Sequence, residues 1–95
     1  MGASNFSNGG KGKTAQEVFT RLVDDSRHEF GHSYSGEIGM KSSFKMVTVP
    51  EGMTVDDFID QCFEDENHIC QDKYGPAACV KVSEGHWIFF GYASS

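Results

Sequence analysis

Two short apolar runs near the end of the chain, residues 78–82 and 87–92, are rich in β-branched and aromatic side chains. The turn between them contains Gly85, and two runs joined in this way are typical of a β-hairpin. Aromatic residues stand at adjacent positions of the second run, so this strand would be aromatic on both faces. One face can be covered by helices. The other is covered by the N-terminal segment or a second subunit, or it stays exposed.

Two helices are expected upstream of the hairpin, and each begins at a threonine with an acidic residue three positions later. Residues 14–17 (TAQE) and 54–57 (TVDD) carry this N-terminal capping pattern. Apolar residues then recur at helical spacing, up to Gly31 in the first helix and to about Asn67 in the second. The two apolar stripes consist of Ala15, Val18, Phe19, Leu22, Val23 and Phe30, and of Val55, Phe58, Ile59, Cys62 and Phe63.

The remaining segments complete a small α+β fold. Residues 44–49 (FKMVTV) are β-rich and stop at Pro50, which predicts a strand. Residues 1–13 are rich in glycine, serine and asparagine, and they are either a flexible arm or an edge strand. We therefore predict one domain over residues 14–95 in the order (β)-α-β-α-β-β, with two helices packed on one face of a mostly antiparallel sheet.

Length and charge argue against several classes of function. A chain of 95 residues has room for one domain, and no apolar run approaches the ~18 residues that a membrane span requires. The net charge of −6 argues against direct binding to nucleic acid, which needs lysine and arginine to displace counterions. The N-terminus lacks a secretory signal pattern, so we expect a cytoplasmic protein.

The cysteines fit a reducing compartment. Cys62, Cys70 and Cys79 are an odd number, which does not suit a disulfide framework. Together with His68 they offer the ligand types of a zinc site, although their spacing differs from that of zinc knuckles. Two of them fall on expected apolar positions, so we favour buried thiols over zinc.

The acidic residues are concentrated in one part of the chain. Residues 51–72 contain eight aspartates and glutamates and no lysine or arginine. The second helix should therefore have an acidic outer face, which is either an ordinary solvated surface or a binding surface for a basic partner. In the second case it could mimic the phosphate backbone of a nucleic acid. The expected binding surface comprises Asp56, Asp57, Asp60, Glu64 and Asp65 with Trp87 and Phe89 of the last strand, through which a homodimer could also form.

One short motif suggests catalysis. His28, Glu29 and His32 form a literal H-E-x-x-H, which resembles the signature of zinc metalloproteases. That resemblance implies His28 and His32 as zinc ligands and Glu29 as general base. The third protein ligand has no clear candidate, and the motif overlaps the expected helix end. The alternative is a charged helix terminus, where histidines suit the negative end of the dipole.

Several segments together resemble small proteins of bacteriophages and prophages. The resemblance rests on MGASNF at the start, EFGH at 29–32, YSGEIG at 34–39, DKYGPAA at 72–78 and FFGY at 89–92. It implies an accessory factor made in an infected bacterium, which binds and blocks a host enzyme or defence complex without catalysis or cofactor. A minimal zinc metalloprotease and a homo-oligomeric structural or assembly protein are the alternatives.

Overall fold

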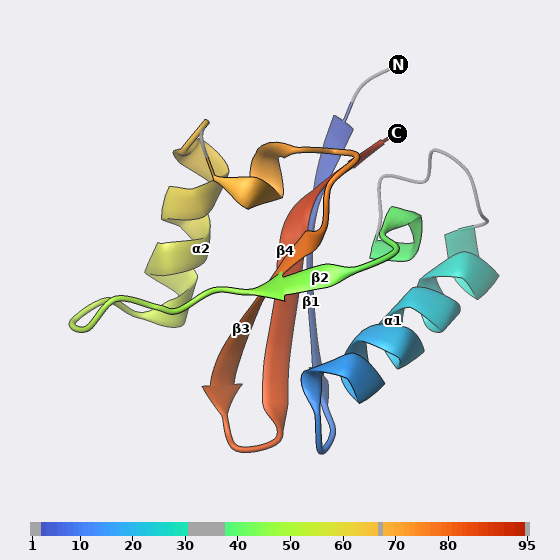
Figure 1. The fold of residues 1–95 in the computed structure, drawn as a ribbon, viewed down its shortest axis with the longest axis horizontal. Helices are drawn as coiled ribbons and strands as arrows, with labels where there is room; N and C mark the ends of the chain where they lie inside the picture. Colours follow the sequence, from blue (N-terminus) through green and yellow to red (C-terminus); the bar gives the residue numbers. More distant parts are fainter. Residues whose placement is uncertain (1–2, 31–37, 67, 95) are drawn as a thin grey trace.

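The computed structural model describes residues 3–30, 38–66 and 68–94. Within these residues the chain forms a four-stranded sheet and two α-helices, which confirms the predicted α+β class (Figure 1). Two single 3₁₀ turns, which the sequence patterns do not predict, connect the elements. The elements are β1 (Ala3–Lys11), α1 (Ala15–Phe30), η1 (Ile38–Met40), β2 (Phe44–Met46), α2 (Val55–Glu64), η2 (Ile69–Gln71), β3 (Ala77–Ser83) and β4 (His86–Ser94).

The strands follow the order β1-β4-β3-β2, so the C-terminal strand is an inner strand of the sheet. β1 is antiparallel to β4 over nine residue pairs, from Ala3↔Ser94 to Lys11↔His86. β3 and β4 form the expected hairpin, and Gly85 in its turn has a positive φ of 74° that glycine adopts without strain. β2 adds to the other side of β3 in parallel. The N-terminal segment is thus an edge strand of the sheet.

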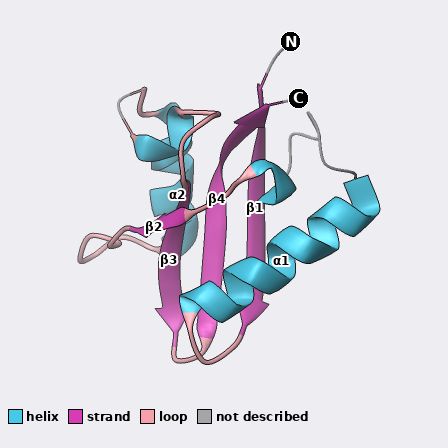
Figure 2. Ribbon diagram, turned by 45° about the vertical axis from the view of Figure 1, so that its right-hand side comes forward, coloured by secondary structure: helices cyan, strands magenta, loops and turns pink. Residues whose placement is uncertain are grey.

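The two helices cover opposite faces of the sheet, whereas the sequence predicts both on one face. Successive side chains of β3 alternate between the two cores, with Cys79 in the core beneath α1 and Val80 in the core beneath α2. β4 alternates in the same way through Phe89 and Phe90. Figure 2 shows α1 crossing in front of the strands. The aromatic residues on both faces of β4 are therefore covered by the chain itself.

The core under α1 is built around three phenylalanine rings. Phe19 of α1, Phe44 of β2 and Phe89 of β4 have ring centroids 5.1–5.4 Å apart. Phe89 is fully buried among them. Tilted and edge-on contacts at this separation are the favoured arrangement of aromatic pairs. This cluster joins the first helix to both an edge strand and an inner strand.

The core under α2 places the second helix over β3 and β4. Phe58, Ile59 and Cys62 are buried, as their spacing predicts, and pack with Phe90 of β4. Phe63 lies edge-on to Phe90 at 5.8 Å between ring centroids. The outer side of α2 consequently faces solvent.

Two elements are shorter than their patterns predict. β2 ends at Met46 and not at residue 49, because the chain leaves the sheet after the Val47 N–H donates to the Cys79 carbonyl at 2.9 Å. Val47 and Val49 lie beyond the strand and pack against the core under α2, which accounts for the apolar pattern of this segment. α2 ends at Glu64, before the expected end near Asn67, and the N–H of Asp65 donates to the Cys62 carbonyl.

Candidate binding surface on helix α2

Thr54 and the buried stripe together fix the orientation of α2. The Thr54 hydroxyl oxygen accepts a hydrogen bond from the Asp57 N–H at 3.1 Å, which satisfies one of the free donors at the helix start. Phe58, Ile59 and Cys62 hold the opposite side of the helix on the sheet. With the start capped and one side buried, the side that faces solvent is determined by the sequence.

The solvent side carries the predicted carboxylates. Asp56, Asp60 and Glu64 follow one another at four-residue intervals and are all exposed, so they form a row along one helix face. Asp57 lies beside this row, and Asp65 is exposed at the C-cap. We call Asp56, Asp57, Asp60 and Glu64 the acidic face of α2. The structure therefore brings together the acidic residues that the sequence singles out.

No basic side chain neutralises this row within the described residues. The last turn of α2 has no basic residue, and none of the described lysines or arginines forms an ion pair with Asp56, Asp60 or Glu64. Elsewhere such a pair does occur, since Lys81 Nζ lies 2.8 Å from a Glu84 carboxylate oxygen. Asp56 at the helix start is favoured by the dipole, whereas Glu64 at the helix end opposes it.

A neutral amide caps the C-terminal end of the acidic helix. Gln71 Nε2 donates to the carbonyl oxygens of Cys62 and Phe63, at 3.0 and 2.7 Å. Lysine or arginine often serves this purpose at helix ends. Gln71 satisfies the carbonyls without adding a positive charge near the carboxylates. Sequence reasoning misses this residue, because nothing in the spacing connects η2 to the end of α2.

The candidate zinc ligands Cys62, His68, Cys70 and Cys79 do not come together at one site. Cys79 faces the core of α1, on the other side of the sheet from Cys62 and Cys70. His68 Nδ1 accepts a hydrogen bond from the Cys70 N–H at 3.1 Å and its ring stacks on Phe90. Within residues 3–30, 38–66 and 68–94, no three His, Cys, Asp or Glu side chains are grouped to hold a metal ion.

Burial keeps the cysteine thiols protonated. It raises the pKa of Cys70 and Cys79 to about 12. Cys62 of α2, on the same side of the sheet as Cys70, also has a raised pKa, from burial and then from the nearby Asp65. The Cys70 thiol donates to the Cys62 carbonyl oxygen at 3.4 Å. Because the thiolate is the nucleophile and the metal ligand, these three residues act as core side chains, as the sequence predicts.

A buried lysine fixes the loop before β3. Lys41 follows η1 and is almost completely buried, and its ammonium donates to the carbonyl oxygens of Asp72, Lys73 and Gly75 at 3.1, 3.3 and 2.9 Å. All three donors of the ammonium are thereby used. Burial lowers the pKa of Lys41, while the charge of Asp72 acts in the opposite direction.

We expect the substitution Lys41→Met to lower the free energy of unfolding by about 2 kcal/mol or more, because three carbonyl groups lose a charged donor. Methionine keeps the aliphatic part of the side chain, so the change isolates the ammonium. Urea denaturation followed by circular dichroism measures the difference. Lys45→Met, at an exposed position of β2, is the matched control and should change stability by no more than about 0.5 kcal/mol. Equal stability of both variants would contradict this assignment.

The H-E-x-x-H motif lies only partly within the described residues. His28 and Glu29 are exposed in the last turn of α1, and the helix ends at Phe30, close to its expected end. His32 lies outside the described residues, so its position relative to His28 is not described. Zinc binding by His28 and His32, with Glu29 as base, stays a prediction.

Of the two aromatic residues predicted for the binding surface, Phe89 lies inside the fold and Trp87 is half-buried. Phe89 is fully buried, and the half-buried Trp87 donates from Nε1 to the Gly12 carbonyl oxygen at 3.4 Å while Lys81 lies over its ring. β4 also has a paired strand on each side, so its backbone is not free to pair with another subunit. Because β4 lies between β1 and β3 and beneath α1, Phe89 is buried and the strand cannot pair with a second subunit.

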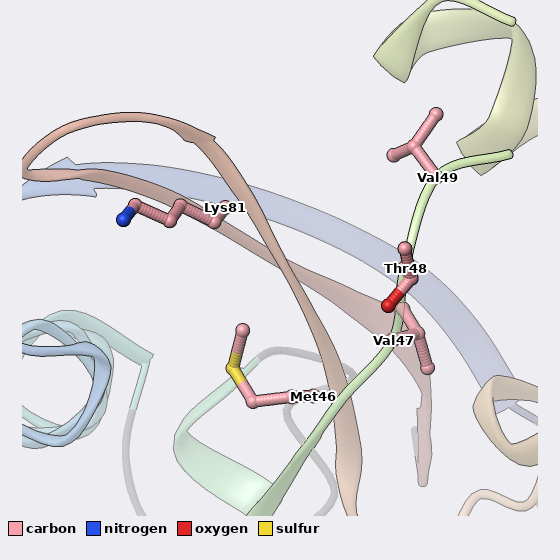
Figure 3. Close-up of a pocket in the computed structure, with 5 residues that line it drawn as sticks. All are labelled: Met46, Val47, Thr48, Val49 and Lys81. Atoms are coloured by element: carbon pink, nitrogen blue, oxygen red, sulfur yellow. The ribbon is translucent and has the colours of Figure 1, made fainter. Parts of the chain in front are cut away.

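A shallow groove of about 270 Å³ lies where the chain leaves β2 (Figure 3). It is lined by Met46, Val47, Thr48, Val49 and Lys81. This lining offers one amine and one hydroxyl group but no carboxylate, imidazole or thiol, so it does not provide the acid–base pair of a hydrolytic site. Among the surfaces of the described residues, the acidic face of α2 therefore carries the stronger functional argument.

Comparisons with known proteins add no further assignment. No family model, no curated protein and no solved structure gives a significant match to this chain. In the part of the chain that the structure describes, no helix has both the length and the apolar character to cross a membrane.

Proposed function

We propose that this protein acts by binding another protein through the acidic face of α2. In this role it is a small accessory factor in the cytoplasm of an infected bacterium, and it inhibits or modulates a host enzyme or defence complex. The observation that carries the proposal is the exposed row of Asp56, Asp60 and Glu64 without a basic neighbour among the described residues. Such a row fits a partner with a basic surface, because complementary charge steers association and selects among partners.

The energetics of α2 support a binding role over an ordinary solvated surface. Like charges four residues apart, such as Asp56 with Asp60 and Asp60 with Glu64, each destabilise a helix by ~0.2–0.5 kcal/mol. Glu64 adds an unfavourable interaction with the negative end of the helix. A helix optimised for stability alone would carry lysine or arginine at some of these positions. A basic partner that neutralises the row explains why it does not.

Mimicry of a nucleic acid is the form of binding that this row suits. Residues four positions apart rise by ~6 Å along a helix, so the three carboxylates are regularly spaced anions on a rigid support. A groove that neutralises phosphates with lysine and arginine could accept them in the same way. The protein would then compete with nucleic acid for its partner.

Neutralising the row should abolish most of the binding. We expect the variant Asp56→Asn/Asp60→Asn/Glu64→Gln to capture its partner from a bacterial lysate at least about tenfold less efficiently than the native chain, because three complementary charges are lost. Quantitative pull-down with tagged protein measures the ratio. The substitutions keep side-chain size and lie on the exposed side of α2, so the fold should be retained.

The matched control removes the same charge from the other helix. Asp24, Asp25 and Glu29 are exposed on α1, and the variant Asp24→Asn/Asp25→Asn/Glu29→Gln carries the same net charge as the α2 variant. It should capture the partner like the native chain. Unchanged capture by the α2 variant, or equal loss in both variants, would count against the acidic face as the binding site.

A further inference from the structure

The outer edge of β1 is a second surface that the proposed function does not use. β1 lies at the end of the sheet, with β4 on one side and, within residues 3–30, 38–66 and 68–94, no strand on the other. It runs for nine residues, which is longer than the usual five to six residues of a strand. Asn5, Ser7 and Gly9 are exposed along it.

The hydrogen-bond pattern shows which backbone groups point outward. The Gly12 N–H donates to the Gly85 carbonyl oxygen at 2.9 Å, directly beyond the last pair of the β1–β4 ladder. Bonded and non-bonded pairs alternate in antiparallel strands, so Phe6, Asn8 and Gly10 bond to β4. The intervening residues Asn5, Ser7, Gly9 and Lys11 direct their N–H and carbonyl groups outward. A hydrogen bond of Arg21 supports this alternation. Its guanidinium donates to the Lys11 carbonyl oxygen, which therefore points away from β4.

This edge lacks the features that usually prevent strands from pairing between molecules. Edge strands are commonly protected by charged residues, proline, a bulge or short length. Residues 3–10 contain no charged residue and no proline, and the register with β4 has no shift. Among the described residues, Arg21 covers only the outward carbonyl at Lys11. With respect to the part of the chain that the structure describes, the outward donors and acceptors between Asn5 and Gly9 remain unpaired.

Charge distinguishes this edge from the other edge of the sheet. β2 offers only three residues, and the chain continues from it into the acidic segment 51–72. Pairing two copies there would bring two acidic helices together. α2 packs on β3 and β4, so pairing through β1 keeps the two acidic faces at the outer ends of the assembly. The basic residues Lys11 and Lys13 lie at the end of β1 and just beyond it, and antiparallel pairing would place those of the two copies at opposite ends of the junction.

We propose that β1 is a self-association edge, at which two copies of this chain pair antiparallel into a continuous eight-stranded sheet. A two-fold axis at Ser7 pairs all nine residues of β1, with Asn5 opposite Gly9 of the second copy. The outward N–H of Ser7 then donates to the second copy, and this bond occurs twice in the dimer. The acidic face of α2 stays free in this arrangement.

Light scattering of the native chain from about 1 to about 300 μM tests the proposal, because this range includes the micromolar affinities at the weak end of protein–protein interfaces. The expected mass rises from 10.5 kDa to twice that value with concentration. Ser7→Pro removes one outward N–H and leaves the bonds to β4 intact, because proline is tolerated where a strand edge faces solvent. We expect it to weaken association about thirtyfold, since two hydrogen bonds are lost per dimer. Ser7→Ala keeps the N–H and should associate like the native chain.

Amide hydrogen exchange gives a readout that does not depend on a folded proline variant. Protection of the amides of Asn5, Ser7 and Gly9 should rise with protein concentration, whereas Phe6 and Asn8 should be protected at every concentration. A native chain that stays at 10.5 kDa throughout, or a dimer in which these three amides exchange freely, would overturn the proposal. The triple variant of the acidic face should still dimerise, so the two proposals fail independently.

Discussion

Truncation of Phe89 to alanine is expected to lower the free energy of unfolding by about 3–5 kcal/mol. The ring is fully buried and contacts both Phe19 and Phe44, so its removal leaves a cavity at the junction of α1, β2 and β4. A loss of this size is a large part of the ~5–15 kcal/mol that stabilises a typical domain. Urea denaturation followed by tryptophan fluorescence and circular dichroism measures it, with Trp87 as the reporter.

Tyr74 provides the matched control for this substitution. It is also aromatic but is 76% exposed, and Tyr74→Ala should change stability by no more than about 0.5 kcal/mol. If Phe89→Ala were as stable as Tyr74→Ala, Phe89 would not belong to the core. In that case the prediction from sequence, in which Phe89 is part of a binding surface, would regain support.

Stability should fall steeply above pH 9, because the buried cysteines ionise far less readily in the folded chain. The pKa of Cys70 and Cys79 is about 12 in the folded state, against an ordinary value of 9.0. Between these values the folded chain holds more protons than the unfolded chain, so rising pH favours unfolding. At pH 11 each thiol lowers the free energy of unfolding by roughly 2–3 kcal/mol, and the two together lower it by roughly 5 kcal/mol. The raised pKa of Cys62 acts in the same direction.

Lys41 partly offsets this loss. Its lowered pKa means that the unfolded chain binds the extra proton, so stability rises with pH in the interval just below 10.5. A comparison of the native chain with Cys70→Ala/Cys79→Ala tests the thiols while Lys41 is present in both proteins. The free energy of unfolding of the double variant should decline much less between pH 9 and pH 11. Parallel profiles for the two proteins would contradict the assignment of buried, protonated thiols.

Local patterns predict much of this fold because they act within single elements. The threonine caps and apolar stripes identify both helices, and the glycine-containing turn at Gly85 identifies the hairpin. The same reasoning places Cys62 and Cys79 in the core. Spacing along the chain also suffices to align Asp56, Asp60 and Glu64 on one exposed face.

Other features depend on contacts between distant segments, which periodicity does not encode. The pairing of β1 with β4 makes a strand of a glycine- and serine-rich segment, and it turns the C-terminal strand into an inner one. This inner strand has apolar side chains on both faces, and α1 covers one face while α2 covers the other. Lys41 donates to carbonyl groups more than thirty residues away, and Gln71 donates to carbonyl groups of another element. No short sequence pattern therefore identifies either residue.

Binding of a basic partner to the acidic face of α2 should depend strongly on salt, because ions screen interactions between exposed charges. Titration of the captured partner with the native chain, the α2 variant and the α1 control, between about 50 and 300 mM NaCl, gives three slopes. A binding site on the acidic face of α2 should give a steep fall in affinity for the native chain and the α1 control, with a much shallower slope for the α2 variant. Affinity that does not change with salt, or three equal slopes, would contradict it.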